Sequence, residues 1–142
     1  MKLVLDTDVL VAAIRSDSGA SRQILLAALA GRVEMLVSTS LLVEYEAVMT
    51  RPKHLAASSL SAEDVGALLD AIAGSAKQVR MAFQWRPTLR DPDDDMVLET
   101  AINGSAEAIV TFNTKDFVDG ASQFGIKLLR PGEVVRKLEE LK

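Results

Sequence analysis

The residues of this chain best suited to chemistry are acidic side chains placed just after short apolar segments. Asp6 and Asp8 follow an apolar run at residues 3–5. A pair of charges at the end of a buried strand carries a large desolvation cost unless a cation or hydrogen bonds compensate it. Because ligands bind beyond the carboxyl ends of strands in open parallel sheets, we expect Asp6 to belong to a site. The alternative is that Asp6 or Asp8 caps a following helix and makes a turn.

A second candidate acid lies on a predicted helix over residues 41–50. The apolar residues of this segment share one face, and Glu44 and Glu46 border that face on opposite sides. Position therefore nominates both acids. Glu44 is nearer the end of the preceding apolar run and fits no capping box. The alternative for either residue is an ordinary solvated helix acid.

The densest acidic group has four aspartates in five residues, where Pro92 marks a helix start: Asp91, Asp93, Asp94 and Asp95. One N-cap and one further acid would satisfy the helix dipole, so four mutually repelling carboxylates exceed that need. A purely dipole-complementing role is the alternative. A last acid, Asp116, follows an apolar run at residues 108–111.

Together these acids predict a cluster of oxygen ligands, because the carboxyl ends of parallel strands lie close in space. Oxygen ligation without His or Cys suits Mg²⁺ or Mn²⁺ rather than Zn²⁺. Such a cation lowers the pKa of a bound water and stabilises a leaving oxygen. The predicted reaction class is metal-assisted hydrolysis of a phosphate ester. The single histidine, His54, is predicted to be a loop residue outside the cluster, and the sequence contains neither GxGxxG nor GxxxxGK[ST].

The elements that would position the acids alternate between strand and helix. Strands are predicted at residues 3–5, 33–37, 78–83, 108–111 and 126–129. Helices are predicted at residues 22–30, 41–50, 61–74, 92–104 and 131–141. This alternation predicts an α/β fold with a central parallel sheet of about five strands and helices on both faces. We expect a single domain over residues 1–142.

Composition is compatible with a nuclease but does not require one. The chain has 142 residues, 49% of them hydrophobic and 25% charged, as in ordinary globular proteins. Its net charge of −4 argues against non-specific nucleic-acid binding through a strongly basic surface. A carboxylate site that holds a cation is still consistent with an acidic chain. The absence of cysteine excludes disulfides, and with no leader and no apolar run of bilayer length we expect a cytoplasmic protein without a membrane segment.

Taken together, these segments resemble the PIN-domain family. The matching segments cover nearly the whole chain: LVLDTDVLV at 3–11, VSTSLLVEYEAVMTRPKHL at 37–55, RDPDDDMVLETAINGSAEAIVTFNTKDF at 90–117 and IKLLRPGEVVRKL at 126–138. Within the family the chain is similar to the VapC-like toxin components of bacterial type II toxin–antitoxin systems. The resemblance implies a Rossmann-like, three-layer α/β/α fold and a Mg²⁺- or Mn²⁺-dependent endoribonuclease. It also implies an RNA substrate, a cognate antitoxin as partner, and a homodimer or higher homo-oligomer.

The resemblance also assigns metal-ligating roles to particular acids. Asp6 matches the first ligand of the family, after the opening strand. Glu44 matches the second, which decides between it and Glu46. The spacing to a later alanine selects Asp94 as the third, with Asp93 and Asp95 as fallback choices.

The fourth position departs from the family pattern. Many members carry Asp after a Val-Thr pair, whereas here the corresponding residue is Asn113, which brings no negative charge. We expect Asp116 to take its place, and Asp8, where the family often has Asn, to offset the missing charge. By the same resemblance, Thr7 would help to position Asp6 or a water, and Ser38 would lie at the rim of the site.

Two other hypotheses compete with the nuclease. Asp6 and Asp8 have the spacing found in haloacid-dehalogenase-type phosphatases, in which Asp6 would be the nucleophile. Against this, Leu10 replaces the expected Thr or Val, the chain is short and no catalytic lysine is placed.

The other is a PIN-like module that binds RNA or protein without turnover, which the acidic balance and Asn113 favour. The basic residues we nominate to hold an RNA backbone are few: Arg51, Lys53, His54, Arg86, Arg90 and Lys115. The alternative is that they are ordinary surface charges.

Overall fold

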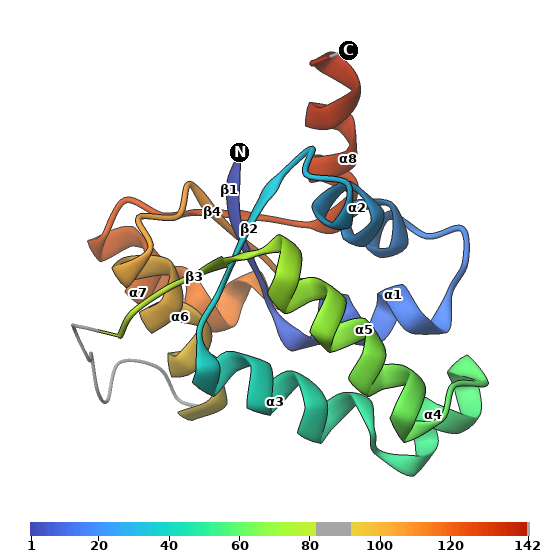
Figure 1. Cartoon of the computed structure of the whole chain (residues 1–142). Coiled ribbons are helices and arrows are strands. Elements are labelled where there is room, and N and C mark those ends of the chain that lie inside the picture. Colours follow the sequence, from blue (N-terminus) through green and yellow to red (C-terminus); the bar gives the residue numbers. More distant parts are fainter. Residues whose placement is uncertain (82–91, 142) are drawn as a thin grey trace.

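The computed structural model describes residues 1–81 and 92–141 and contains a central sheet of five parallel strands. The strands are β1 (Lys2–Leu5), β2 (Glu34–Val37), β3 (Lys77–Gln78), β4 (Ala108–Val110) and β5 (Lys127–Leu129). Their order across the sheet is β3-β2-β1-β4-β5, so β1 is the central strand (Figure 1). The predicted α/β class and the parallel five-stranded sheet are confirmed.

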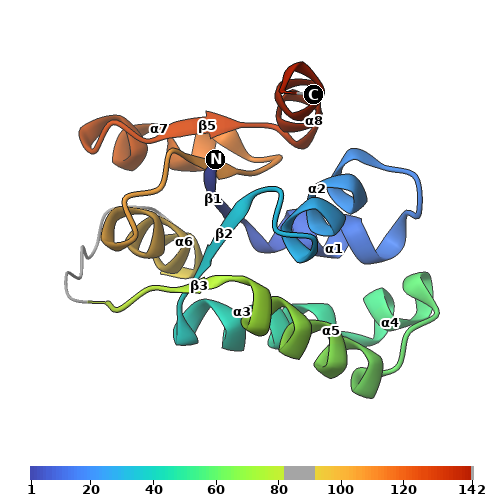
Figure 2. The ribbon, with the colours of Figure 1, turned by 45° about the horizontal axis from the view of Figure 1, so that its top comes forward.

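Eight helices flank the sheet in the described part of the chain. They are α1 (Thr7–Arg15), α2 (Ala20–Leu29), α3 (Thr39–Met49), α4 (Pro52–Ser58), α5 (Ala62–Ser75), α6 (Pro92–Asn103), α7 (Thr114–Gln123) and α8 (Pro131–Glu140). Figure 2 shows α6 and α7 on one side of the sheet and α1, α2 and α8 on the other, which gives a three-layer α/β/α arrangement. None of the described helices combines the length and apolar character needed to cross a bilayer.

The core explains why the central strand is a continuous apolar run. Leu3, Val4 and Leu5 are at most 1% exposed, because helices cover both faces of a parallel sheet. The end of α6 also approaches the sheet closely at Gly104. A Cβ atom there would lie 2.8 Å from Leu36 Cδ1 and 2.9 Å from Val79 Cγ2, so only glycine fits without displacement.

The third strand differs from its prediction over residues 78–83. The strand is Lys77–Gln78, and residues 79–81 lie beyond it, while 82 and 83 lie outside the described residues. The N–H of Val79 donates to the carbonyl of Val37 at 2.7 Å, and Val37 is the last residue of β2. Because β3 pairs only with β2, its ladder ends where β2 ends.

None of the helices predicted from the sequence corresponds to α4 or α7, and α1 corresponds to the helix that the capping alternative for Asp6 or Asp8 requires. The prediction that His54 is a loop residue was wrong, because His54 lies in α4 and is 8% exposed. The predicted end of the preceding helix near residue 50 is confirmed, since α3 ends at Met49. Pro52 then begins a new helix, because the missing N–H of proline costs nothing at the first helical position.

Candidate active site

The candidate active site lies at the carboxyl edge of the sheet, where Asp6 joins the ends of β1 and β4. Asp6 caps α1: its Oδ1 accepts from the N–H of Thr7 at 2.8 Å. Its Oδ2 accepts from Thr111 Oγ1, directly after β4, also at 2.8 Å. The residue is only 6% exposed. The capping alternative is thus correct as a description of local structure, but it accounts for only one of the two carboxylate oxygens.

Asp8 extends the same network from the first turn of α1. Its Oδ2 accepts from the N–H of Phe112 at 3.1 Å and from Asn113 Nδ2 at 3.0 Å. Its Oδ1 is buried and has no hydrogen-bond partner among the described residues. Because a buried polar atom without a partner is costly, this oxygen is the least satisfied feature of the site.

The electrostatics of this pair show that ionising both carboxylates is unfavourable in the described part of the chain. Burial raises the pKa of Asp6, and the charge of Asp116 adds to that effect, although the hydrogen bonds from Thr111 and Thr7 oppose it. Burial, followed by the charge of Asp6, raises the pKa of Asp8 to about 7. Both shifts indicate that no cationic side chain among the described residues compensates these carboxylates.

The other predicted acids lie on helices that begin at this same edge. Glu44 is half-buried in α3, and Asp94 is half-buried in the first turn of α6. The two helices pack against each other, and α3 also packs against α1 (Figure 1). Asp116 is exposed in the first turn of α7 and close enough for its charge to act on Asp6. Asp95 is 3% exposed, and Asp93 lies outside the residues whose side chains are described.

In the part of the chain that the structure describes, no three His, Cys, Asp or Glu side chains are grouped closely enough to hold a metal ion. The donor chemistry nevertheless fits a hard cation, since the available groups are carboxylate oxygens. One of them, Asp8 Oδ1, is buried and has no partner within the described part of the chain. Like charges at one edge repel each other when no cation lies between them.

The supporting residues differ in part from the predictions. Thr7 positions Asp6 through its backbone N–H. Ser38 does not lie at an open rim, because it is fully buried: it accepts from the N–H of Leu41 and bonds Thr100 Oγ1 at 2.8 Å, which joins α3 to α6.

Sequence reasoning missed Thr111 and Tyr45. Thr111 Oγ1 donates to Asp6 and also accepts from the N–H of Asn113 at 2.9 Å. Tyr45 is fully buried and its hydroxyl donates to the carbonyl of Leu5 at 2.5 Å, which fixes the strand end before Asp6. The available signals were the hydroxyl of the Val-Thr pair that ends the fourth apolar run and the tyrosine beside Glu44.

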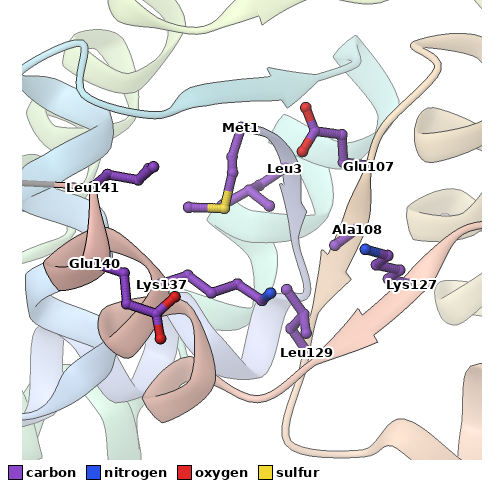
Figure 3. Close-up of a pocket in the computed structure, with 9 residues that line it drawn as sticks. All are labelled: Met1, Leu3, Glu107, Ala108, Lys127, Leu129, Lys137, Glu140 and Leu141. Atoms are coloured by element: carbon purple, nitrogen blue, oxygen red, sulfur yellow. The ribbon is translucent and has the colours of Figure 1, made fainter.

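A cavity of about 240 Å³ lies at the opposite, amino-terminal edge of the sheet. Figure 3 shows the residues around it: Met1, Leu3, Glu107, Ala108, Lys127, Leu129, Lys137, Glu140 and Leu141. None of them is a predicted site residue. The cavity therefore does not coincide with the candidate active site, which is identified by its carboxylates rather than by a concave shape.

Comparison with known proteins agrees with the resemblance seen in the sequence. A family model described as the PIN domain matches residues 2–115. Among solved structures, the chain is similar to one in the crystal structure of VapBC2 from Rickettsia felis bound to a DNA fragment from their promoter. The TM-score is 0.59 and the identity 18%, and the match covers 92% of this chain and 98% of that chain. At this identity the likeness concerns the fold alone. No curated protein sequence matches.

The family match spans both the central strand with Asp6 and the segment from Thr111 to Asn113 that holds the Asp6–Asp8 pair. It therefore favours the PIN hypotheses over the haloacid-dehalogenase hypothesis. The chain belongs to the PIN-domain family.

Proposed function

We propose that this protein is a divalent-metal-dependent endoribonuclease and the toxin of a type II toxin–antitoxin pair. PIN domains are generally nucleases that use divalent metal ions. The observation that carries the proposal is the pair formed by the buried Asp6 and the half-buried Asp8, whose negative charge when ionised has no cationic partner in the described part of the chain. A hard divalent cation is the species that would compensate it.

In this proposal Asp6, Glu44, Asp94 and Asp116 hold Mg²⁺ or Mn²⁺. The bound ion would supply a water of lowered pKa and charge stabilisation for the leaving oxygen of an RNA phosphodiester. The protein itself keeps the first carboxylate in place, since Thr111 and the N–H of Thr7 each bind one oxygen of Asp6.

A group of basic residues supports a nucleic-acid substrate. Arg15, Arg51 and Lys53 surround the buried His54, and we call these four residues the basic cluster. Burial is the first cause that lowers the pKa of His54, and the three cations add to it. Arg15 lies nine residues after Asp6 on the same helix, roughly 13 Å along the axis. This separation suits contacts to backbone phosphates away from the cleaved bond.

Of the other basic residues nominated from the sequence, Lys115 is exposed in the first turn of α7. Arg86 and Arg90 lie outside the described residues.

The partner proposals rest on family and fold. The solved structure similar to this chain is described as VapBC2 bound to promoter DNA. We propose that an antitoxin protein likewise binds this chain and that the chain forms a homodimer or higher homo-oligomer. Co-expression with any small reading frame adjacent to the gene, followed by co-purification, tests the first point. Light scattering of the purified protein tests the second.

The activity is tested with a mixed RNA pool incubated with Mn²⁺ or with EDTA. Wild-type protein is expected to cleave only with Mn²⁺, and Asp6→Ala and the isosteric Asp6→Asn are expected not to cleave. Asp119→Ala, an exposed aspartate of α7, is the matched control and should cleave like wild type. Equal cleavage by wild type and both Asp6 variants, each shown to be folded by circular dichroism, would refute the proposal.

A non-catalytic PIN-like module that binds RNA or protein is the second candidate. It is favoured by Asn113, at a position where an acid would supply charge, and by the absence of a three-ligand group among the described side chains. RNA binding without Mn²⁺-dependent cleavage by wild type would select this candidate.

A further inference from the structure

Phe112 is an exposed aromatic residue directly beside the carboxylate pair. Its exposed fraction is 41%, whereas Tyr45 and Phe117 are fully buried. It lies between Thr111, which binds Asp6, and Asn113, which binds Asp8. Single exposed apolar residues are common and need no explanation by themselves. The position of this one at the candidate active site does.

Hydrogen bonds to the carboxylate pair fix the backbone that carries the ring. The N–H of Phe112 donates to Asp8 Oδ2 at 3.1 Å, and Asn113 Nδ2 donates to the same oxygen at 3.0 Å. Thr111 Oγ1 accepts from the N–H of Asn113 at 2.9 Å. The backbone at Phe112 is thus ordered before any ligand arrives, so a ligand that contacts the ring pays little entropy to order this segment.

The charge at this edge restricts which part of a nucleic acid the ring can attract. Asp6, Asp8 and Asp116 make the edge negative, and phosphates are repelled there unless a cation is bound. Base stacking on an aromatic ring requires no positive charge and accepts any base, because every base has a π-face. The ring is therefore suited to the base rather than to the phosphate of a bound nucleotide.

We propose that Phe112 is a stacking platform for an unpaired base of the substrate, next to the position of cleavage. This inference rests on the proposed function and narrows it to single-stranded RNA, because bases in a duplex do not offer a free face. It assigns Phe112 a role in substrate binding rather than in bond cleavage.

The test measures binding to the full chain in an Asp6→Asn background, with Mg²⁺ present. The probes are a short fluorescein-labelled single-stranded RNA of mixed sequence, its duplex, and an oligomer of equal length with abasic riboses. Phe112→Ala and Phe112→Leu are expected to weaken single-strand binding roughly 5- to 150-fold, whereas Phe112→Trp retains it. Phe124→Ala, at the far end of α7 and 37% exposed in the native chain, is the matched control.

The abasic oligomer separates stacking from a structural effect. It should bind weakly and equally to wild type and Phe112→Ala. Trp85 is the single tryptophan of the chain, so a Trp85→Phe background makes the tryptophan of Phe112→Trp the only one present. Its fluorescence should be quenched by single-stranded RNA and not by the abasic oligomer. Unchanged binding of single-stranded RNA by Phe112→Ala would overturn the proposal. Full binding by Phe112→Leu would overturn it too, since leucine keeps apolar bulk without a π-face.

Failure of this inference is distinguishable from failure of the proposed function. Metal-dependent cleavage with no effect of Phe112→Ala on KM would leave the nuclease standing and remove the stacking role. Phe112-dependent binding of single-stranded RNA without cleavage by wild type would support the stacking role and refute the nuclease. If Phe112→Ala abolished only co-purification of a protein partner, the ring would be a protein contact and the proposal would be wrong.

Discussion

Replacing Asp8 by asparagine is expected to stabilise the metal-free protein. The substitution keeps an oxygen that can accept from Phe112 and Asn113. It places an amide at the position of Asp8 Oδ1, which is buried with no partner in residues 1–81 and 92–141, and it removes one of two neighbouring negative charges. Proteins commonly gain stability when a strained or charged functional site is neutralised.

The magnitude follows from the pKa of Asp8, which rises from 3.8 to about 7. A shift of about 3 pKa units at about 1.36 kcal/mol each places an upper bound near 4 kcal/mol on the cost of ionising Asp8 in the folded state. Because Asp8 is partly solvated and the amide has its own desolvation cost, we expect a gain of about 1–3 kcal/mol in the free energy of unfolding. That corresponds to roughly 3–12 °C in Tm for a chain of this size.

The assay is thermal and urea unfolding in EDTA at several pH values. A raised carboxyl pKa means that the folded protein binds protons more tightly than the unfolded chain, so wild-type stability falls as pH rises from about 4 to above 7. The advantage of Asp8→Asn should be largest at pH 8 and should disappear toward pH 4. Asp119→Asn is the exposed control and should show no such difference. Equal or lower stability of Asp8→Asn at pH 8 would refute this account of the site.

Three further perturbations test other contacts of the fold. Thr111→Val removes the hydroxyl that binds Asp6 and is expected to lower the free energy of unfolding by about 1–3 kcal/mol and to reduce cleavage. Thr111→Ser keeps the hydroxyl and should retain both stability and cleavage. Unchanged stability of Thr111→Val would contradict the hydrogen bond to Asp6. Gly104→Ala forces a Cβ against the sheet and should lower the free energy of unfolding by about 1–3 kcal/mol. Gly74→Ala, with open space around it in α5, should leave that free energy unchanged or raise it by about 0.5–1 kcal/mol. Urea unfolding that ranked the two variants the other way would be inconsistent with this packing. The pKa of His54 is lowered in the folded state, so the unfolded chain binds a proton on this residue more tightly than the folded protein does. Stability should therefore fall as pH drops below about 6.5. His54→Gln should reduce this dependence of Tm on pH, as measured in thermal melts at several pH values.

The strands and the main acidic position were predictable because they depend on local patterns. A continuous apolar run followed by two acids indicates a buried parallel strand whose end carries charge, and the structure places Asp6 there. The helix predicted over residues 61–74 is also confirmed, and a capping box fixes its start, since Ser61 and Asp64 accept from each other's backbone N–H. These features involve residues a few positions apart, so the sequence contains the whole interaction.

The rest of the site was not predictable because its contacts join residues about a hundred positions apart. The bonds from Thr111 to Asp6 and from Asn113 to Asp8 depend on the pairing of β1 with β4, and no local pattern specifies which hydroxyl will face which carboxylate. The same strand pairing also explains the residues at positions 8 and 113. An asparagine that looked like a lost ligand at position 113 is the donor that holds an extra acid at position 8, so the two departures from the family pattern form one hydrogen-bonded unit. That exchange keeps the net charge but changes the ligand geometry. It moves a carboxylate from the end of β4 to the first turn of α1, where one of its two oxygens is buried without a partner among the described residues. A site built this way has a cost in the metal-free state, and the cost is removed by either a proton or a cation. Comparing the stability of wild type and Asp8→Asn in EDTA and in Mn²⁺ would show whether a proton or a cation is preferred. A cation bound by the pair should raise the stability of wild type in Mn²⁺ and change that of the variant little.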